Sequence, residues 1–208
     1  MRAFGIGGML GVVWFSATVL LLQLTAAPGE DWTHRYVSEF ANGPIGWLFG
    51  VGLFGNAVGN GLVGAGLYGL LPRGTVRTAA TTLFVCAATG LALAGIFDAD
   101  PPGTEMSAAG MVHRSAVSTA FVVGLIALAL FSGAFAARPD WQFAARISIS
   151  LTALAAVASL ALLLAFFFGW RPGLVERLAI APFLLWEFWA GAYVVRRAWR
   201  SARAELRS

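Results

Sequence analysis

Six apolar runs of about 20 residues each dominate this chain and limit its fold more than any other feature. A helical run of that length matches the hydrocarbon thickness of a bilayer. In this chain of 208 residues the runs cover residues 4–26, 45–71, 78–97, 113–136, 144–169 and 174–195. We therefore predict an all-α polytopic membrane protein with six transmembrane helices in one antiparallel bundle.

The composition excludes the main soluble alternatives. The chain is 59% hydrophobic and only 12% charged, whereas soluble domains are about 45–50% apolar and about 25% charged. A pI near 10.2 would suggest nucleic-acid binding in a soluble protein. Here the arginines lie at the ends of the apolar runs, where they orient helices. We expect no nucleic-acid partner, and we predict a single domain that covers residues 1–208.

Arginine placement predicts how the helices are oriented. Ten of the 14 arginines lie with two acids at alternate ends of the runs, and the opposite ends hold four arginines and seven acids. Cytoplasmic ends of transmembrane helices are the ends that collect arginine. We predict a multi-pass protein of the cell (inner) membrane with both termini in the cytoplasm. The first run exceeds the roughly 7–15 apolar residues of a signal peptide, so we expect a retained helix.

Residues 30–42 (EDWTHRYVSEFAN), between the first two runs, combine charged with aromatic side chains. Trp32, Tyr36 and Phe40 are spaced by four residues, which would place them on one face of a helix. The sequence therefore predicts a short amphipathic helix lying at the outer membrane interface.

A second polar segment, residues 95–114 (GIFDADPPGTEMSAAGMVHR), separates the third and fourth runs. With alternating helices, polar residues from four segments are expected at the same outer membrane boundary. These segments are residues 38–39, 98–100, 113–114 and 176–177. Ionisable groups near a bilayer are costly unless they pair or meet water, so such a collection is a candidate site. We predict an outer-facing polar pocket whose ligand-binding residues are Glu39, Asp98, Arg114, Glu176 and Arg177.

Several short motifs carry a resemblance to a known family. They are residues 38–47 (SEFANGPIGW), 95–101 (GIFDADP), His113, 173–177 (GLVER) and Leu185–Trp186. In this order they resemble the DUF998 family of bacterial and archaeal membrane proteins. The position of Asp98 is often not acidic in that pattern, whereas Asp100 and His113 match it. The family has no assigned function, so the resemblance implies a six-helix membrane fold and no catalytic residues.

The outer polar residues are compatible with three roles. Arg114 can neutralise Asp98 or Asp100, and Arg177 can neutralise Glu39, in an ion-pair network that holds the loops. Alternatively, Arg114 or Arg177 binds the phosphate or carboxylate of a ligand headgroup. In a third role, His113 is a general acid or base held by Asp100.

The sequence does not point to a metal or cofactor. The two histidines lie in different segments, and neither forms part of a zinc-ligand pair at helical spacing. No phosphate-binding loop or dinucleotide fingerprint is present in the sequence. We expect no cofactor and no metal site.

Three polar residues interrupt the apolar runs. Asn56 and Asn60 lie one turn apart in the second run, and Glu187 lies near the middle of the sixth. Such groups must find partners inside the bilayer. We predict that Glu187 is a neutral acid that hydrogen-bonds Asn56 or Asn60, and a proton or cation site of a transporter is the functional alternative. The same second run carries two GxxxG motifs, which predict close approach of helices.

Taken together, these features favour a protein that binds a lipid headgroup or a small amphiphile. Membrane lipids are then its expected partners, and a homo-oligomer or a partner membrane subunit is compatible with the sequence. The alternatives are a membrane-embedded enzyme that uses Asp100 and His113 on a lipid-linked substrate, and a small transporter centred on Asn56, Asn60 and Glu187.

Overall fold

The computed structural model describes residues 1–26 and 29–205, and long helices make up most of that part of the chain. The helices are α1 (Arg2–Leu24), α2 (Trp47–Leu70), α3 (Thr75–Ile96), α4 (Ala108–Ala136), α5 (Gln142–Phe168) and α6 (Pro172–Glu205). Two short 3-10 helices, η1 (Ser38–Asn42) and η2 (Pro139–Trp141), lie in the connections. All six long helices have the length and apolar character needed to cross a membrane. The prediction of six helices that are long and apolar enough to span a membrane is confirmed.

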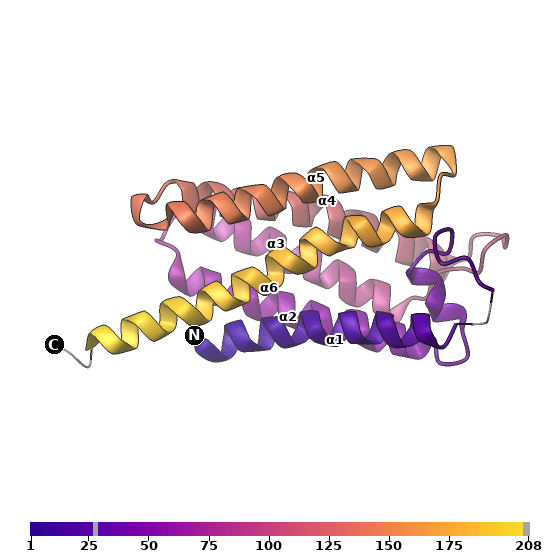
Figure 1. Ribbon diagram of the computed structural model, residues 1–208, viewed down its shortest axis with the longest axis horizontal. Helices are drawn as coiled ribbons and strands as arrows, with labels where there is room; N and C mark the ends of the chain where they lie inside the picture. The colour runs from indigo at the N-terminus through magenta and orange to yellow at the C-terminus, as the bar shows by residue number, and fades with distance from the viewer. Residues whose placement is uncertain (27–28, 206–208) are drawn as a thin grey trace.

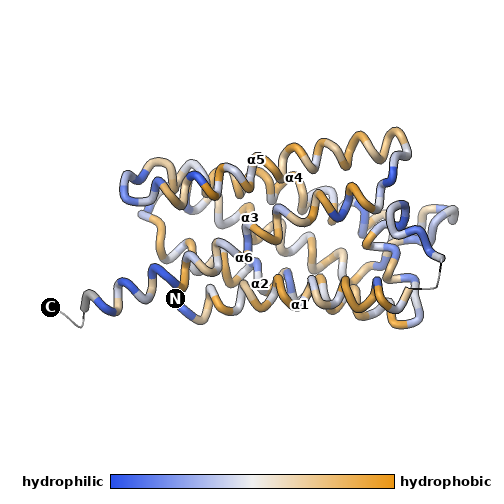
Figure 2. Tube along the Cα trace, viewed as in Figure 1, coloured by the Kyte–Doolittle hydropathy of each residue, from blue (hydrophilic) through white to orange (hydrophobic). Residues whose placement is uncertain are grey.

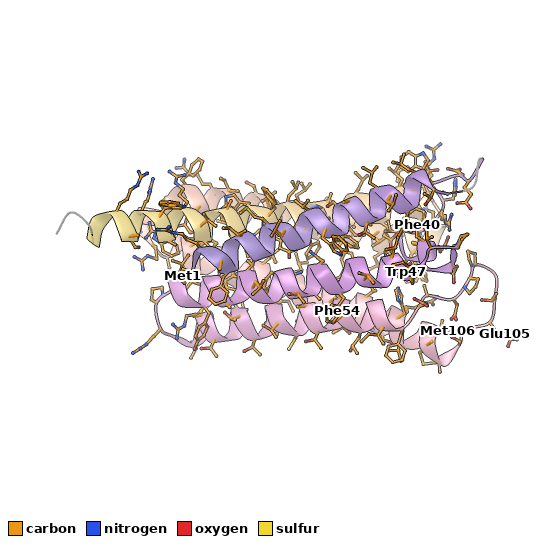
Figure 3. The ribbon with its side chains drawn as sticks, turned by 90° about the horizontal axis from the view of Figure 1, so that it is seen from below. Met1, Phe40, Trp47, Phe54, Glu105 and Met106 are labelled. Carbon is orange, nitrogen blue, oxygen red and sulfur yellow. The ribbon has the colours of Figure 1, made fainter. Side chains whose placement is uncertain are left out.

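The six helices run along one common direction, so that the bundle has two distinct ends (Figure 1). We call the end with the N-terminus and residues 71–74 the termini end, and α6 extends beyond the bundle there. The opposite end, called the loop end, holds residues 25–26, 29–46, 97–107 and 169–171. Figure 3 shows Met1 at the termini end and Phe40, Trp47, Glu105 and Met106 at the loop end.

Each helix packs against its neighbours in sequence, and α6 closes the ring by packing against α1. Helix α2 also contacts α6, so it lies towards the inside of the bundle. Helix α5 is the least buried of the six: only 11% of the most apolar 18-residue stretch of this helix is buried inside the bundle. Hydrophilic residues gather at the two ends and apolar residues lie between them, as expected for a bundle surrounded by lipid (Figure 2).

Glycines fix how closely the helices approach. A Cβ atom at Gly50 of α2 would overlap the carbonyl oxygen of Gly95 in α3. At Gly59 a Cβ would lie 3.0 Å from the Cα of Gly11 in α1. The close approach predicted from the GxxxG motifs is therefore observed, because only hydrogen side chains leave room for these contacts.

The predicted interfacial helix over residues 30–42 is confined to η1, so Trp32, Tyr36 and Phe40 do not share one helical face. The carboxylate of Asp31 accepts hydrogen bonds from the amide and the hydroxyl of Thr33, at 2.9 and 2.6 Å. These local bonds compete with helix formation, and together with His34 they lower the pKa of Asp31 to about 2. Phe40 is buried rather than turned towards lipid.

A tight reversal between α5 and α6 positions two of the candidate residues. Helix α5 ends at Gly169, which adopts a left-handed conformation with φ of 65°. Arg171 also has a positive φ, and Pro172 then begins α6. Proline suits the first turn of a helix because the amide there has no helical partner. The reversal places Glu176 and Arg177 in the first turns of α6, next to residues 30–42.

Candidate functional site

Arg177 is the centre of the polar contacts at the loop end. Its Nη1 donates to the carbonyl oxygens of Trp32 at 3.1 Å, Arg35 at 2.8 Å and Gly173 at 2.8 Å. Its Nη2 donates to Oε1 of Gln23 at 2.9 Å. One guanidinium thus ties residues 32–35 to α1 and α6. One of the roles compatible with the sequence paired Arg177 with a carboxylate such as Glu39, but the hydrogen-bond acceptors observed are neutral oxygens.

Glu176 lies next to Arg177 in sequence and is buried, with 9% of the residue exposed. One of its carboxylate oxygens accepts a hydrogen bond from the amide of Val37. The amide of Leu174 similarly donates to the carbonyl of Thr33, at 2.9 Å. Hydrogen bonds donated in both directions therefore join the beginning of α6 to residues 33–37.

His113 is buried in the first turns of α4, with 5% of the residue exposed. Its Nδ1 lies 2.9 Å from the carbonyl oxygen of Ala94 and 2.8 Å from that of Phe97. Both neighbours only accept hydrogen bonds, so Nδ1 carries a proton. His113 therefore caps the carbonyl end of α3.

Asp100 has partners different from those of His113. Its carboxylate accepts from the amide and the hydroxyl of Ser107, at 2.9 and 2.6 Å. Ser107 in turn caps α4 by accepting from the amide of Gly110 at 3.0 Å. Among the described residues, no hydrogen bond joins Asp100 to His113. The enzyme hypothesis lacks the acid–histidine contact that it requires.

Of the other predicted ligand-binding residues, Glu39 lies within electrostatic range of Arg177 and Glu176, whereas Arg114 and Asp98 form no hydrogen bond with this cluster in the described structure. Arg114 is exposed and lies over the ring of Phe166, with 5.9 Å from its guanidinium carbon to the ring centre. Asp98 is exposed, and Glu39 is partly buried, which raises the pKa of its carboxyl. Within the described part of the chain, Arg114 forms no ion pair with Asp98 or Asp100. The ion pairs at this end are instead Arg35–Glu30 and His34–Asp31.

The polar residues inside the membrane meet as predicted. Asn56 Nδ2 donates to Oε2 of Glu187 at 2.9 Å. Asn60 Nδ2 lies 3.3 Å from the carbonyl oxygen of Asn56 and 3.4 Å from its side-chain oxygen. The second carboxyl oxygen of Glu187, Oε1, is buried and has no hydrogen-bond partner in the described structure.

A groove opens on the outside of the bundle between α1 and α6, near the loop end. Its volume is about 440 Å³, and Val19, Leu20, Ile180 and Leu184 are among its lining residues. Gln23, Trp32 and Arg177 line its polar end. Ser16, Leu20 and Ala181 are exposed, so the groove opens towards the lipid that surrounds the bundle. Figure 1 shows α6 diverging from α1 towards the loop end. We refer to this feature as the α1–α6 groove.

A second cavity, of about 100 Å³, lies between the helices and is called the interior cavity below. Side chains of α1, α2, α3, α4 and α6 line it. His113 and Glu176 lie near its loop end, and Asn56, Asn60 and Glu187 lie deeper. Glu176 and Glu187 are 11 residues apart in α6, so the cavity extends for about 16 Å along that helix.

A family model described as "Protein of unknown function (DUF998)" matches residues 9–193. The chain belongs to the DUF998 family. The matched region contains every residue that lines the α1–α6 groove and the interior cavity of this DUF998 protein. No curated protein and no solved structure is significantly similar to the chain.

Some residues at these sites carry no clear signal in the sequence. Gln23 was not predicted because it is a single neutral amide at the end of an apolar run. The hydroxyl of Ser148 accepts from Trp186 Nε1 at 2.8 Å and lies 2.7 Å from Ser132 Oγ. Serine in a transmembrane helix usually bonds its own backbone, so this link between α4, α5 and α6 was not evident.

Within the described residues, no group of three metal-binding side chains is arranged around one point.

We expect the stability contributed by Asp100 to be lost in acid. The two bonds from Ser107 hold the pKa of Asp100 below its ordinary value of 3.8. The contribution is then complete above the pKa of the unfolded chain and is lost as pH falls through the lower folded pKa. Thermal midpoints of wild type and Asp100→Asn should differ near pH 7 and converge as the pH falls below the ordinary pKa of 3.8. A difference that stays constant over this range would contradict the assignment.

Proposed function

We propose that the protein binds a lipid or another amphiphile from the surrounding membrane in the α1–α6 groove. The observation that carries this proposal is a groove of about 440 Å³ with apolar walls and a polar end. Volumes of about 300–1,000 Å³ with apolar walls and a few placed polar groups are typical of ligand sites. The apolar part suits an acyl chain, and the polar end suits a headgroup.

The headgroup that this polar end favours is a phosphate or a carboxylate. Arg177 is the cation at that end of the groove, and Trp32 lies beside it. A guanidinium has five N–H groups, of which Nη1 provides two and Nη2 provides two. The bonds to described residues use Nη1 and one N–H of Nη2, which leaves Nε and the second N–H of Nη2 for a ligand oxygen. Such charge-assisted hydrogen bonds are the strong ones in anion recognition.

The charge distribution supports an orientation for this site. With both termini in the cytoplasm, as the arginine bias predicts, the loop end and the groove face the outer leaflet of the inner membrane. A ligand would then enter sideways from that leaflet, because Ser16, Leu20 and Ala181 line the groove from the exposed side.

Filling the groove is expected to remove a tightly held lipid. Ala181 is exposed and lines the groove, so Ala181→Trp adds a large side chain there without disturbing the core. Ala17 is an exposed alanine of α1 that does not line the groove, and Ala17→Trp is the matched control. Native mass spectrometry after detergent exchange should show a lipid adduct on wild type and on Ala17→Trp. The amount of adduct on Ala181→Trp should be at least about ten-fold lower, which corresponds to the loss of one buried apolar group of the lipid.

Two outcomes would count against the groove. Equal adducts on all three proteins would mean that the lipid is held elsewhere. The absence of any adduct from wild type, when the protein is extracted from its own membrane, would mean that the groove holds only exchangeable solvating lipid.

A further inference from the structure

We propose that the interior cavity is a binding site for an organic cation with an ammonium group, held by the carboxylate of Glu187. This site differs from the α1–α6 groove in position and in charge, and it goes beyond lipid binding. The proposal rests on three properties of the cavity: the charges that line it, an unpartnered carboxyl oxygen, and its aromatic walls.

The charges around the cavity select for a positive ligand. Two carboxyl groups, those of Glu176 and Glu187, line it, and none of the arginines in the described part of the chain does. This is notable in a chain that has 14 arginines and 10 acids. His113 is the other titratable group that lines the cavity, and its Nδ1 proton is directed at the backbone of α3. An anionic ligand would find no counter-charge among these residues.

Glu187 has an acceptor atom to offer. The residue is 3% exposed, and Oε2 is already bonded to Asn56. Oε1 is fully buried and has no partner among the described residues. An unsatisfied acceptor in a protein interior costs about 1–3 kcal/mol, and more when it is charged. Glu187 lines the cavity, and its Oε1 lies beside Gly59 of α2. A donor that reaches Oε1 from the cavity would remove that cost, and an ammonium ion would also supply the missing positive charge.

The walls of the cavity suit an organic rather than an inorganic cation. Five phenylalanines line it: Phe15, Phe49, Phe84, Phe121 and Phe183. Aromatic faces attract ammonium groups, and they also cover apolar carbon atoms attached to them. A calcium ion would need about six to eight oxygen ligands, and the described residues contain no group of three metal-binding side chains. A small aryl or alkyl ammonium ion therefore matches this site best.

The interior cavity and the α1–α6 groove are adjacent. Phe15, Val37, Ile180 and Leu184 line both the interior cavity and the α1–α6 groove. These four side chains therefore form the wall between the two spaces.

The test compares a charged probe with a neutral probe of the same shape. Benzylammonium and benzyl alcohol are titrated calorimetrically into the full-length protein in detergent, for wild type, Glu187→Gln and Ala181→Trp. Glutamine keeps the size of the side chain and its acceptor for Asn56, but it removes the charge. We expect wild type to bind benzylammonium more tightly than benzyl alcohol. Glu187→Gln should bind benzylammonium about ten-fold or more weakly than wild type, because it loses one charge-assisted hydrogen bond. Affinity for benzyl alcohol should change little.

Each outcome decides the proposal. Equal affinity of wild type and Glu187→Gln for benzylammonium would overturn it. Two results on wild type alone would also overturn it: equal affinity for the two probes, or no binding of benzylammonium. The two comparisons on wild type hold even if Glu187→Gln does not fold. Ala181→Trp should bind benzylammonium as wild type does, because Ala181 lines only the groove. Loss of binding in that variant would mean that the probe occupies the groove, which contradicts a separate site at Glu187.

Discussion

Replacing Arg177 by alanine is expected to lower the free energy of unfolding by about 2–3 kcal/mol, the cost of removing a partly buried charged donor from its acceptors. The guanidinium bonds the carbonyls of Trp32 and Arg35 and the side chain of Gln23, which come from different segments. Its loss should release residues 30–42 from α6. Denaturant titration followed by tryptophan fluorescence measures the stability, and limited proteolysis between α1 and α2 reports the release.

Arg114→Ala is the matched control for this prediction. Arg114 is also an arginine at the loop end, but it is exposed and its described contact is with the ring of Phe166. Exposed contacts of this kind contribute about 1 kcal/mol or less. If both variants lost the same stability, Arg177 would not be the residue that holds the loop end together.

The glycine contacts between helices predict a second large effect. In Gly50→Ala the new methyl group would overlap the carbonyl oxygen of Gly95, so α2 and α3 must separate. Overpacking of this kind costs about 1–3 kcal/mol, and rigid backbone on both sides puts this case at the upper end. The free energy of unfolding in detergent is again the quantity to measure.

Gly61→Ala on the same helix separates packing from helix propensity. A Cβ at Gly61 meets no atom within 4 Å. Since alanine is a better helix former than glycine, this variant should be unchanged or up to about 1 kcal/mol more stable. A similar loss in Gly50→Ala and Gly61→Ala would show that backbone effects, rather than the α2–α3 contact, dominate.

The helices and the contact between Asn56 and Glu187 could be predicted because the bilayer leaves few alternatives. A backbone in hydrocarbon must satisfy its own hydrogen bonds, so runs of about 20 apolar residues become helices. Three polar side chains in such helices have few partners except one another. Asn56 and Glu187 are therefore joined although they are 131 residues apart.

The loop end was less predictable because its charged side chains bind the backbone. Two of the roles compatible with the sequence paired Arg177 with an acid or His113 with Asp100. In the structure the turn at residues 31–35 presents carbonyls to Arg177, and the end of α3 presents carbonyls to His113. Backbone oxygens carry no residue-type signal, so these partners are invisible in the sequence.

The α1–α6 groove could not be predicted either, because it depends on how two helices cross. A Cβ at Gly191 of α6 would lie only 2.8 Å from the carbonyl oxygen of Gly5 in α1. The helices thus touch near the termini end, and they diverge towards the loop end. Both glycines are visible in the sequence, but their contact across 186 positions is not.

The most direct test of the central claim is photo-crosslinking of the protein in its own membrane. A phospholipid with a diazirine in its acyl chain is activated, and the labelled peptides are mapped by mass spectrometry. A specific site predicts strong labelling at groove residues such as Ser16, Leu20 and Ala181, above the labelling of equally exposed positions on α5 such as Val157 and Leu160. Labelling that follows exposure alone, with the groove no stronger than α5, would contradict the claim that the groove is a binding site.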